Sequence, residues 1–475
     1  MKRTFTTAIL MMMACIAFPQ ANPQPDYKTY FSDATMRVDY FHTGTADEEH
    51  FSVDRIINDG NWAGSKTQLL DNLNRGLYFV EVRDKASGKP IYSRGFASIF
   101  GEWQTIPEAK TRWGTFHESA RFPWPKEPVE LLIFKRDEKN DFQEIWRTEI
   151  DPESRKVNPA EYQSPYKSWS LMDNGDPSQK VDIVILGDGY SAEEMDKFRA
   201  DVERLSNALF KVEPFMSRKA DFNVLAVETP APKSGVNKPH PGVFRRTPLS
   251  MSYSAFDSER YALAYDNRTI RDAASTVPYD HMFILINEAT YGGGGIFNLY
   301  STVAVDNKFS DYIFVHEFGH SFAALADEYY ASSVSYEKPD NTIEPWEPNV
   351  TALHDPDNLK WKDLVEPGTP IPTPWDKEKF DRHSMEIQKE RSKLRAAKVP
   401  ESEVEALFER ERKEMLAMID QMEYKNVTGA FEGANYNQYG QYRSAIDCIM
   451  FTRNKQVFCP ACRRAIGQVI DLYAE

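Results

Sequence analysis

The stretch from His316 to Tyr329 reads HEFGHSFAALADEY, and it decides how the rest of the chain is interpreted. On a helix, His316 and His320 lie one turn apart on the same face, where two neutral imidazoles can bind one zinc ion. Glu317 follows the first histidine and would face the water position next to that ion. This combination is typical of peptidases that activate water with zinc, and it predicts Glu317 as the general base.

The residues around the histidines predict a helix with one buried flank. Ser310 or Asp311 can cap its N-terminus. Apolar residues then recur every three or four positions through Phe314, Phe318 and Phe322, so the histidine flank faces a different environment. A pair of histidines that only supports the packing is the simpler alternative, and the surrounding sequence has to decide between the two.

A catalytic zinc site has three protein ligands, so a third ligand is needed. Metzincin-like enzymes supply it from about six residues after the second histidine, but here that position is Ala326, which cannot bind a metal. On an uninterrupted helix, Asp327 would lie about 10 Å along the axis from His320. The helix must therefore end near Ala324 and the chain must fold back. We predict Asp327 as the third ligand, with Glu328 or a distal residue as the alternatives.

The chain ahead of this helix alternates between strands and helices, which predicts an α/β (α+β) metzincin-like domain. Residues 181–186 (VDIVIL) form a continuous apolar strand, and residues 191–194 (SAEE) form a capping box that starts a helix. Two more strands are predicted at 222–227 and 281–286. We therefore predict a catalytic domain at 181–475, in which the zinc helix packs against a sheet.

The first third of the chain has a different pattern. Between residues 22 and 155, short β-branched and aromatic runs are separated by polar turns, which predicts an all-β sandwich domain. This segment lacks clustered carboxylates or histidines, so we interpret it as an accessory domain. Residues 156–180, which are rich in Pro, Ser and Lys, are the predicted linker.

Residues 376–424 are dominated by Lys, Arg and Glu. Apolar residues such as Leu394, Leu407 and Ile419 recur at roughly helical spacing on either side of Pro400. The pattern predicts a charged helical hairpin inserted into the catalytic domain. We interpret it as a solvated excursion, and a lid or a partner-binding arm is the alternative.

Two further segments flank the zinc helix. Residues 291–298 read YGGGGIFN and lead into a predicted strand at 299–305. These glycines either allow an extended peptide to approach a sheet edge or form a flexible loop. Downstream, the run IDCIMF at 446–451 contains Met450, and metzincin-like enzymes have a turn there whose methionine lies under the zinc site.

Apart from Cys15, the cysteines are Cys448, Cys459 and Cys462. In an exported protein, three cysteines favour one disulfide and one free thiol, and we predict that Cys448 pairs with one of the other two. The CPAC motif at 459–462 is alternatively half of a structural zinc site, although a four-thiolate site would need a cysteine that the chain lacks. A redox-active pair is a third interpretation.

The N-terminus predicts export. Lys2 and Arg3 precede an apolar run at 8–18 that is too short to span a bilayer, so a signal peptide is predicted at 1–21. The residues before Cys15 loosely resemble a lipobox, which makes a lipid anchor through Cys15 an alternative. The mature protein would be secreted, periplasmic or lipid-anchored at the bacterial cell surface. Its formal net charge of −15 argues against a nucleic-acid partner.

Several ordered motifs resemble the bacterial IgA-peptidase family of zinc metallopeptidases. They are ILGDGY (185–190), HEFGHSFAALADEY (316–329), GAFEGANYNQYGQYR (429–443), CIM (448–450) and FCPAC (458–462). The predicted sandwich is similar to the N-terminal domain of that family. The resemblance implies an exported endopeptidase that acts on a protein or peptide, with Zn²⁺ bound by His316, His320 and an acidic residue of the DEY segment. It also implies Glu317 as the catalytic residue, but it does not imply IgA as the substrate.

Some relatives of this class use tyrosines to stabilise the oxyanion, which makes Tyr442 or Tyr439 a candidate for that role. Two other functions stay open at this point. One is a surface binding protein with a vestigial metal site, and the other is a zinc amidase that acts on cell-wall peptides. No feature of the sequence predicts the oligomeric state.

Overall fold

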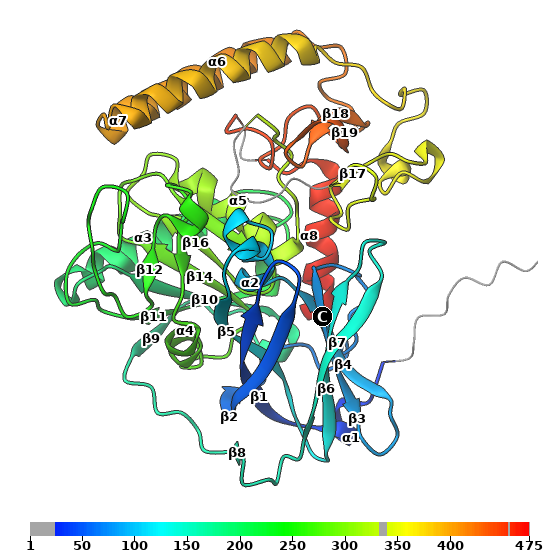
Figure 1. Cartoon of the computed structure of the whole chain (residues 1–475), viewed down its shortest axis with the longest axis vertical. Coiled ribbons are helices and arrows are strands. Elements are labelled where there is room, and N and C mark those ends of the chain that lie inside the picture. The colour runs from blue at the N-terminus through cyan, green and yellow to red at the C-terminus, as the bar shows by residue number, and fades with distance from the viewer. Residues whose placement is uncertain (1–23, 332–339, 455–456, 475) are drawn as a thin grey trace, which may run out of the picture.

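The computed structural model describes residues 24–331, 340–454 and 457–474. The predicted signal peptide at 1–21 and Cys15 lie outside these residues. Within them, no helix is both long enough and apolar enough to cross a membrane. Figure 1 shows a sheet-rich N-terminal part beside a mixed α/β part, with a helical hairpin at the opposite end from the N-terminal sheets.

The N-terminal part contains two four-stranded sheets. The first has the order β5 (Gly114–Pro125), β1 (Phe31–Gly44), β2 (Glu49–Asn61) and β8 (Val157–Asn158), and the second has the order β4 (Pro90–Phe96), β3 (Tyr78–Asp84), β6 (Val129–Arg136) and β7 (Phe142–Ile150). Alternate residues of β3, namely Tyr78, Val80 and Val82, are buried and share one hydrophobic cluster with Val38 of β1. The two sheets are therefore held together by the inward-facing residues of each. Two short helices, α1 (Tyr27–Tyr30) and α2 (Ile99–Trp103), complete this part.

A six-stranded sheet forms the centre of the α/β part. Its order is β15 (Gly293–Ile296), β16 (Tyr300–Ala304), β14 (His281–Ile286), β10 (Val181–Asp188), β11 (Phe222–Glu228) and β9 (Lys167–Met172). The four inner strands are parallel, and the two edge strands β9 and β15 are antiparallel to their neighbours. A two-stranded ribbon of β12 (Met251–Ser252) and β13 (Leu263–Ala264) lies outside this sheet.

Helices cover both faces of the central sheet. Ile183 and Ile185 of β10 join a cluster with α3 (Met195–Leu209), α5 (Ser310–Ala323) and α8 (Pro460–Tyr473). Val184 and Leu186 point to the other face and join a cluster with α4 (Asn267–Ala274). Because successive residues of a strand point to opposite faces, a strand covered on both sides is apolar at nearly every position, as VDIVIL is apart from Asp182.

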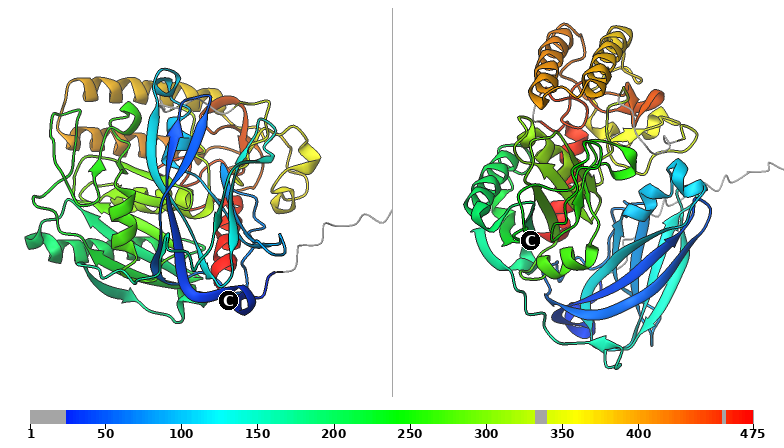
Figure 2. Two further views of the ribbon diagram at one scale, coloured as in Figure 1. Left: turned by 60° about the horizontal axis from the view of Figure 1, so that its bottom comes forward. Right: turned by 60° about the vertical axis from the view of Figure 1, so that its left-hand side comes forward.

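The C-terminal third adds a helical hairpin and a small sheet. The hairpin consists of α6 (Lys377–Ala396) and α7 (Glu401–Ile419), and the sheet has the order β17 (Val350–Thr351), β19 (Asn437–Arg443) and β18 (Phe431–Ala434). The right-hand view of Figure 2 shows the hairpin above the α/β part and the N-terminal sheets at the lower right of the α/β part.

A buried arginine connects the N-terminal part to the α/β part. Arg75 is only 3% exposed, and its Nη1 donates hydrogen bonds to the carbonyl oxygens of Ala323 (3.2 Å) and Ala465 (2.9 Å). Ala323 is the last residue of α5, so this guanidinium lies at the negative end of that helix dipole. The N-terminal part therefore supports the helix that carries both histidines.

The predicted disulfide is not formed. Cys448, Cys459 and Cys462 are all buried and unbonded, and the Sγ atoms of Cys448 and Cys462 are 3.9 Å apart. A disulfide would require a separation of about 2.05 Å.

Candidate active site

Helix α5 ends with a reversal of the chain. Ala324 has a left-handed backbone conformation (φ 58°, ψ 34°). Its N–H donates to the oxygen of His320 (3.0 Å), and the N–H of Leu325 donates to the oxygen of Gly319 (3.2 Å). The first bond is that of an αL motif, in which the N–H of the left-handed residue bonds to the carbonyl four residues earlier, and the second bond satisfies one more carbonyl of the last turn. The chain therefore turns where the sequence predicted a break, and Asp327 comes back toward the histidines.

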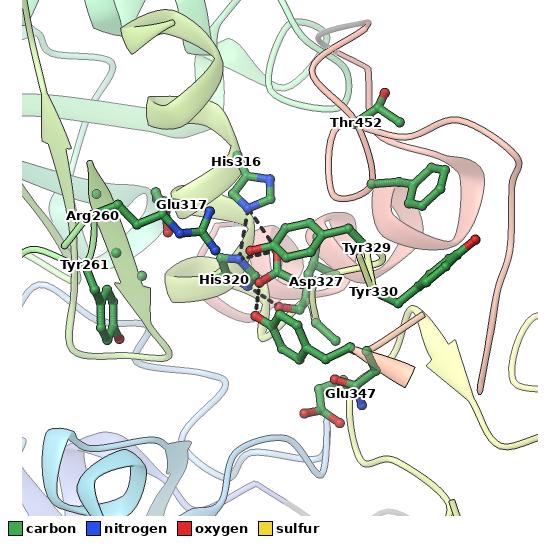
Figure 3. A pocket seen from close by; sticks show the side chains of 18 of the residues that line it. Arg260, Tyr261, His316, Glu317, His320, Asp327, Tyr329, Tyr330, Glu347 and Thr452 are labelled. Atoms are coloured by element: carbon green, nitrogen blue, oxygen red, sulfur yellow. Dashed lines mark hydrogen bonds and ion pairs between the residues drawn. The ribbon is translucent and has the colours of Figure 1, made fainter. Parts of the chain in front are cut away.

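Three side-chain atoms converge next to this turn. Asp327 Oδ1 lies 3.1 Å from His316 Nε2 and 3.3 Å from His320 Nε2, and the two Nε2 atoms are 3.2 Å apart. Figure 3 shows the three side chains pointing toward one another. Ligands of a tetrahedral zinc ion with bonds of 2.0–2.1 Å lie about 3.3 Å apart. The spacing of these three atoms therefore fits a zinc ion.

Hydrogen bonds determine which ring nitrogens face this centre. His316 Nδ1 lies 2.9 Å from the oxygen of Ile449, and His320 Nδ1 lies 2.5 Å from the oxygen of Leu325, so each Nδ1 carries a hydrogen and donates it. In neutral imidazoles, both Nε2 lone pairs then face Asp327 Oδ1, which is buried and has no hydrogen-bond partner. Such a group of atoms needs a positive charge among them, which a metal ion or a bound proton can supply. Burial lowers the pKa of His320, but Asp327 raises it to about 9 overall.

The tip of a β-hairpin holds Asp327 in place. Asp327 Oδ2 accepts a hydrogen bond from the hydroxyl of Tyr436. Asn435 and Tyr436 are the two loop residues between β18 and β19, and both have positive φ (51° and 62°), as in a type I′ turn. Their N–H groups donate to the oxygens of Asp327 (2.9 Å) and Tyr329 (3.0 Å). The orientation of the acidic ligand therefore depends on this turn.

Glu317 lines the same cavity as the three convergent residues (Figure 3). Burial raises the pKa of its carboxyl group, and the neighbouring His316 and His320 partly oppose this effect. A carboxylate with a raised pKa is a stronger base, which suits it to accept a proton from water.

The glycine run upstream of α5 forms the edge strand β15 rather than a flexible loop. A Cβ atom on Gly295 would lie 2.4 Å from the oxygen of Glu317 and 2.9 Å from His320 Cβ. A Cβ atom on Gly294 would lie 2.5 Å from the ring of Tyr261. Gly295 is therefore required because β15 packs directly on the backbone of the histidine helix, and Gly294 because Tyr261 covers its other face.

Met450 lies under the same helix. A Cβ atom on Gly319 would lie 2.9 Å from Met450 Sδ, and the oxygen of Met450 accepts a hydrogen bond from the N–H of Glu328 (2.8 Å). The turn that contains Met450 therefore contacts both the histidine helix and the acidic segment.

His316, Glu317, His320 and Asp327 line a cavity of about 400 Å³ with walls from distant parts of the chain. Glu102 of α2 comes from the N-terminal part, where burial raises its pKa to about 7 and the hydroxyl of Tyr261 donates to it (2.5 Å). Phe408 and Met415 of α7 form part of another wall. The charged hairpin is thus more than a solvated excursion, because part of its apolar face lines the cavity.

Arg260 is a cavity residue that no sequence motif indicated. Its side chain extends toward Glu317 and His320 in Figure 3. Burial lowers the pKa of its guanidinium, but Tyr329 and Asp327 are among the neighbours that raise it overall. A permanent positive charge therefore lies beside the convergent side chains.

Tyr442 and Tyr439 are not among the described residues that line the cavity. Tyr442 is the second-last residue of β19, opposite Glu432 of β18, and Tyr439 is 61% exposed. The tyrosines near Asp327 are instead Tyr329 and Tyr436. Tyr436 belongs to the same motif as Tyr442, but its direction depends on the hairpin turn, which the spacing of the motif does not reveal.

Comparison with known families gives two matches. Residues 169–470 match a family profile described as IgA Peptidase M64, and residues 26–147 match a profile described as Peptidase M64 N-terminus. A comparison with curated proteins finds no match.

Proposed function

The chain belongs to the M64 family of IgA peptidases, and from this membership we propose that it is a zinc-dependent, metzincin-like endopeptidase. The observation that carries the proposal is the convergence of His316, His320 and Asp327 beside Glu317 in one cavity. His316, His320 and Asp327 would hold the zinc ion.

Zinc at this position would supply Lewis-acid chemistry, which polarises the scissile carbonyl and lowers the pKa of water to about 7. The Glu317 carboxylate accepts the proton of the attacking water and then delivers it to the nitrogen of the leaving amine. Tyr436 keeps Asp327 oriented through its hydrogen bond to Oδ2. The carbonyl oxygens of Ile449 and Leu325 keep the two imidazoles oriented in the same way.

Arg260 would stabilise the oxyanion that develops when water attacks the peptide carbonyl. Its guanidinium is a fixed positive charge in a buried position near Glu317 and Asp327. Electrostatic groups of this kind act on charge that is present only in the transition state.

Replacing Arg260 with Met is therefore expected to lower kcat by roughly 10²- to 10³-fold with little change in KM. The measurement is steady-state cleavage of a fluorogenic peptide, with metal content determined in parallel. Arg260→Lys keeps the charge and should recover part of the loss. An unchanged kcat in Arg260→Met at full metal content would remove Arg260 from the mechanism.

The substrate would be an extended stretch of polypeptide. Strand β15 is the edge of the central sheet and lines the cavity through Gly293, Gly294 and Gly295. The N–H and oxygen of Gly293 already bond to Arg260 and Ala262, so an extended peptide would add through backbone hydrogen bonds to the rest of this edge. Walls from α2 and from the α6–α7 hairpin limit access to the cavity. The substrate that enters it would therefore be an unfolded segment or an exposed loop of a protein.

We also propose that the protein is exported, as its N-terminal residues predict, and that it acts outside the cytoplasm as a secreted, periplasmic or lipid-anchored enzyme. Tryptic mapping of the mature N-terminus from the producing cell would test this. Retention of residues 1–21 in the mature chain would contradict it.

Removal of the metal is the direct test of the proposed function. The purified protein should cleave casein, lose this activity when 1,10-phenanthroline removes the metal, and regain it when Zn²⁺ is added. Muropeptides serve as the second substrate. Cleavage of muropeptides but not of casein would indicate an amidase. Cleavage of neither substrate would indicate a binding protein. Cleavage by the metal-free protein would exclude the metallopeptidase mechanism.

A further inference from the structure

A second group of side chains that could hold a metal ion lies next to the candidate active site in the chain, since Glu328 directly follows Asp327. Glu328, Cys448, Cys459 and Cys462 are all buried, and each offers one ligand atom within 4.8 Å of the other three. The mechanism proposed above uses none of these four side chains. They come from the segment after α5, from the turn before Met450 and from the start of α8.

Three of the six distances within this group are close to those of a tetrahedral metal site, and the other three are no longer than 4.8 Å. Cys448 Sγ and Cys462 Sγ are 3.9 Å apart, while Glu328 Oε1 lies 3.3 Å from Cys462 Sγ and 3.7 Å from Cys459 Sγ. For Zn–S bonds of 2.3 Å and Zn–O bonds near 2.1 Å, tetrahedral geometry places two sulfurs about 3.8 Å apart and a sulfur and an oxygen about 3.6 Å apart. The four side chains are therefore at coordinating distances around a common centre.

Backbone and hydroxyl hydrogen bonds favour a thiolate at Cys459 and, more weakly, at Cys448. The N–H of Cys459 donates to Cys448 Sγ (3.3 Å), and the N–H of Cys462 donates to Cys459 Sγ (3.5 Å). The hydroxyl of Ser444 also donates to Cys459 Sγ (3.0 Å). Cys459 is the N-cap of α8, where the helix dipole favours a negative charge.

Glu328 is oriented as a ligand would be. Its Oε1 accepts a hydrogen bond from Asn349 Nδ2 (3.1 Å), which fixes the plane of the carboxyl group. Its Oε2 is buried without a hydrogen-bond partner, and the residue is 0% exposed. A carboxylate buried among thiols is costly unless a cation compensates its charge.

Arg443 offsets part of the negative charge of such a site. It is 0% exposed, and Glu328 and Cys448 are among the groups that interact with its charge. The negative charge of three thiolates and one carboxylate is larger than the positive charge of a divalent ion. An adjacent arginine reduces the remaining negative charge.

We propose that Glu328, Cys448, Cys459 and Cys462 bind a second zinc ion in a closed, structural site. Three soft thiolates select zinc over the hard cations that prefer oxygen, and four protein ligands leave no position for water. The fourth ligand that a four-cysteine site would need is supplied by a carboxylate. In an oxidising compartment the metal also protects the three thiols from disulfide formation.

This second site would hold the first one in place, a consequence that rests on the proposed function. Asp327 and Glu328 are consecutive, and their side chains face the two different groups. A second connection runs through Cys448, which directly precedes Ile449. The carbonyl oxygen of Ile449 accepts the hydrogen bond from His316 Nδ1. The closed site therefore fixes both the acidic ligand and the orientation of one imidazole.

The test is a metal count on the intact protein. Purified wild-type protein should contain two zinc ions per chain by mass spectrometry, His316→Ala should contain one, and the double variant Cys459→Ser with Cys462→Ser should contain one at most. After exchange with Co²⁺, His316→Ala should keep the near-ultraviolet thiolate-to-cobalt charge-transfer absorption, which the double variant should lack. The double variant should also lose activity by roughly 10- to 100-fold, as changes around metal ligands do.

The wild-type protein alone also decides the question, so a double variant that fails to fold does not prevent the test. Alkylation of denatured, unreduced protein in the presence of a chelator should label Cys448, Cys459 and Cys462. Detection of a disulfide among them, or a single zinc ion that His316→Ala removes completely, would overturn the proposal. Two zinc ions in a protein without peptidase activity would contradict the proposed function while leaving this site intact.

Discussion

Glu317→Gln is expected to lower kcat/KM for peptide cleavage by roughly 10²- to 10⁴-fold while the metal content stays unchanged. Gln has the same shape as Glu but cannot accept the proton of the attacking water. Because Glu317 is not one of the three convergent atoms, the substitution leaves the candidate metal ligands intact. The measurements are cleavage of a fluorogenic peptide and metal analysis of the same sample.

Asp311→Asn is a matched control for this variant. Asp311 lies on the same helix, but its carboxylate pairs with Arg204 outside the cavity (2.7 Å). We expect the control to cleave like the wild type. Activity within a few-fold of the wild type in Glu317→Gln would show that another group is the base.

Asp327→Asn is expected to remove the proposed catalytic metal, and with it the peptidase activity. Asn keeps the shape of the side chain but lacks the negative charge that attracts zinc. Changes to groups that only orient a ligand weaken metal binding by 10- to 100-fold, so loss of a ligand should weaken it by more than about 100-fold. Metal titration followed by activity at each zinc concentration measures this effect.

The response to added zinc distinguishes the two variants. Asp327→Asn should regain part of its activity at high zinc concentration, because occupancy is its main defect, whereas Glu317→Gln should not respond. Asp327→Asn should also keep the thiolate-bound metal. Full occupancy of the first site at the zinc concentration that saturates the wild type would exclude Asp327 as the third ligand.

The histidine helix and the break after it could be predicted from local rules. The i, i+4 spacing of His316 and His320 defines one face of a helix in any fold. The position of Asp327 followed from the length of a helical turn, since the residue could approach the histidines only if the helix ended first. The structure ends α5 at Ala323 and brings the three side chains together.

Other parts of the site depend on contacts between distant residues. Arg260 and Glu102 reach the cavity from segments without any motif, and Tyr436 rather than Tyr442 reaches Asp327 because of a two-residue turn. A spacing pattern indicates which residues share a strand, but it does not give the direction of a loop residue with positive φ.

The cysteines show a different limit of sequence reasoning. Counting thiols predicted a disulfide, since three cysteines cannot make a four-thiolate site. The fourth side chain is Glu328, which is far from Cys448, Cys459 and Cys462 in sequence. Only the folded chain brings a carboxylate into that group, because the turn after α5 must first position it.

Arg75 affects how this protein can be divided or recombined. Its contacts with Ala323 and Ala465 cross from the N-terminal sheets to the end of the histidine helix, and Glu102 crosses in the same direction to the cavity. A fragment that starts after the predicted linker would expose these carbonyl groups and lack one wall of its cleft. The smallest unit for engineering, or for exchange between homologues, therefore contains both the N-terminal part and the α/β part.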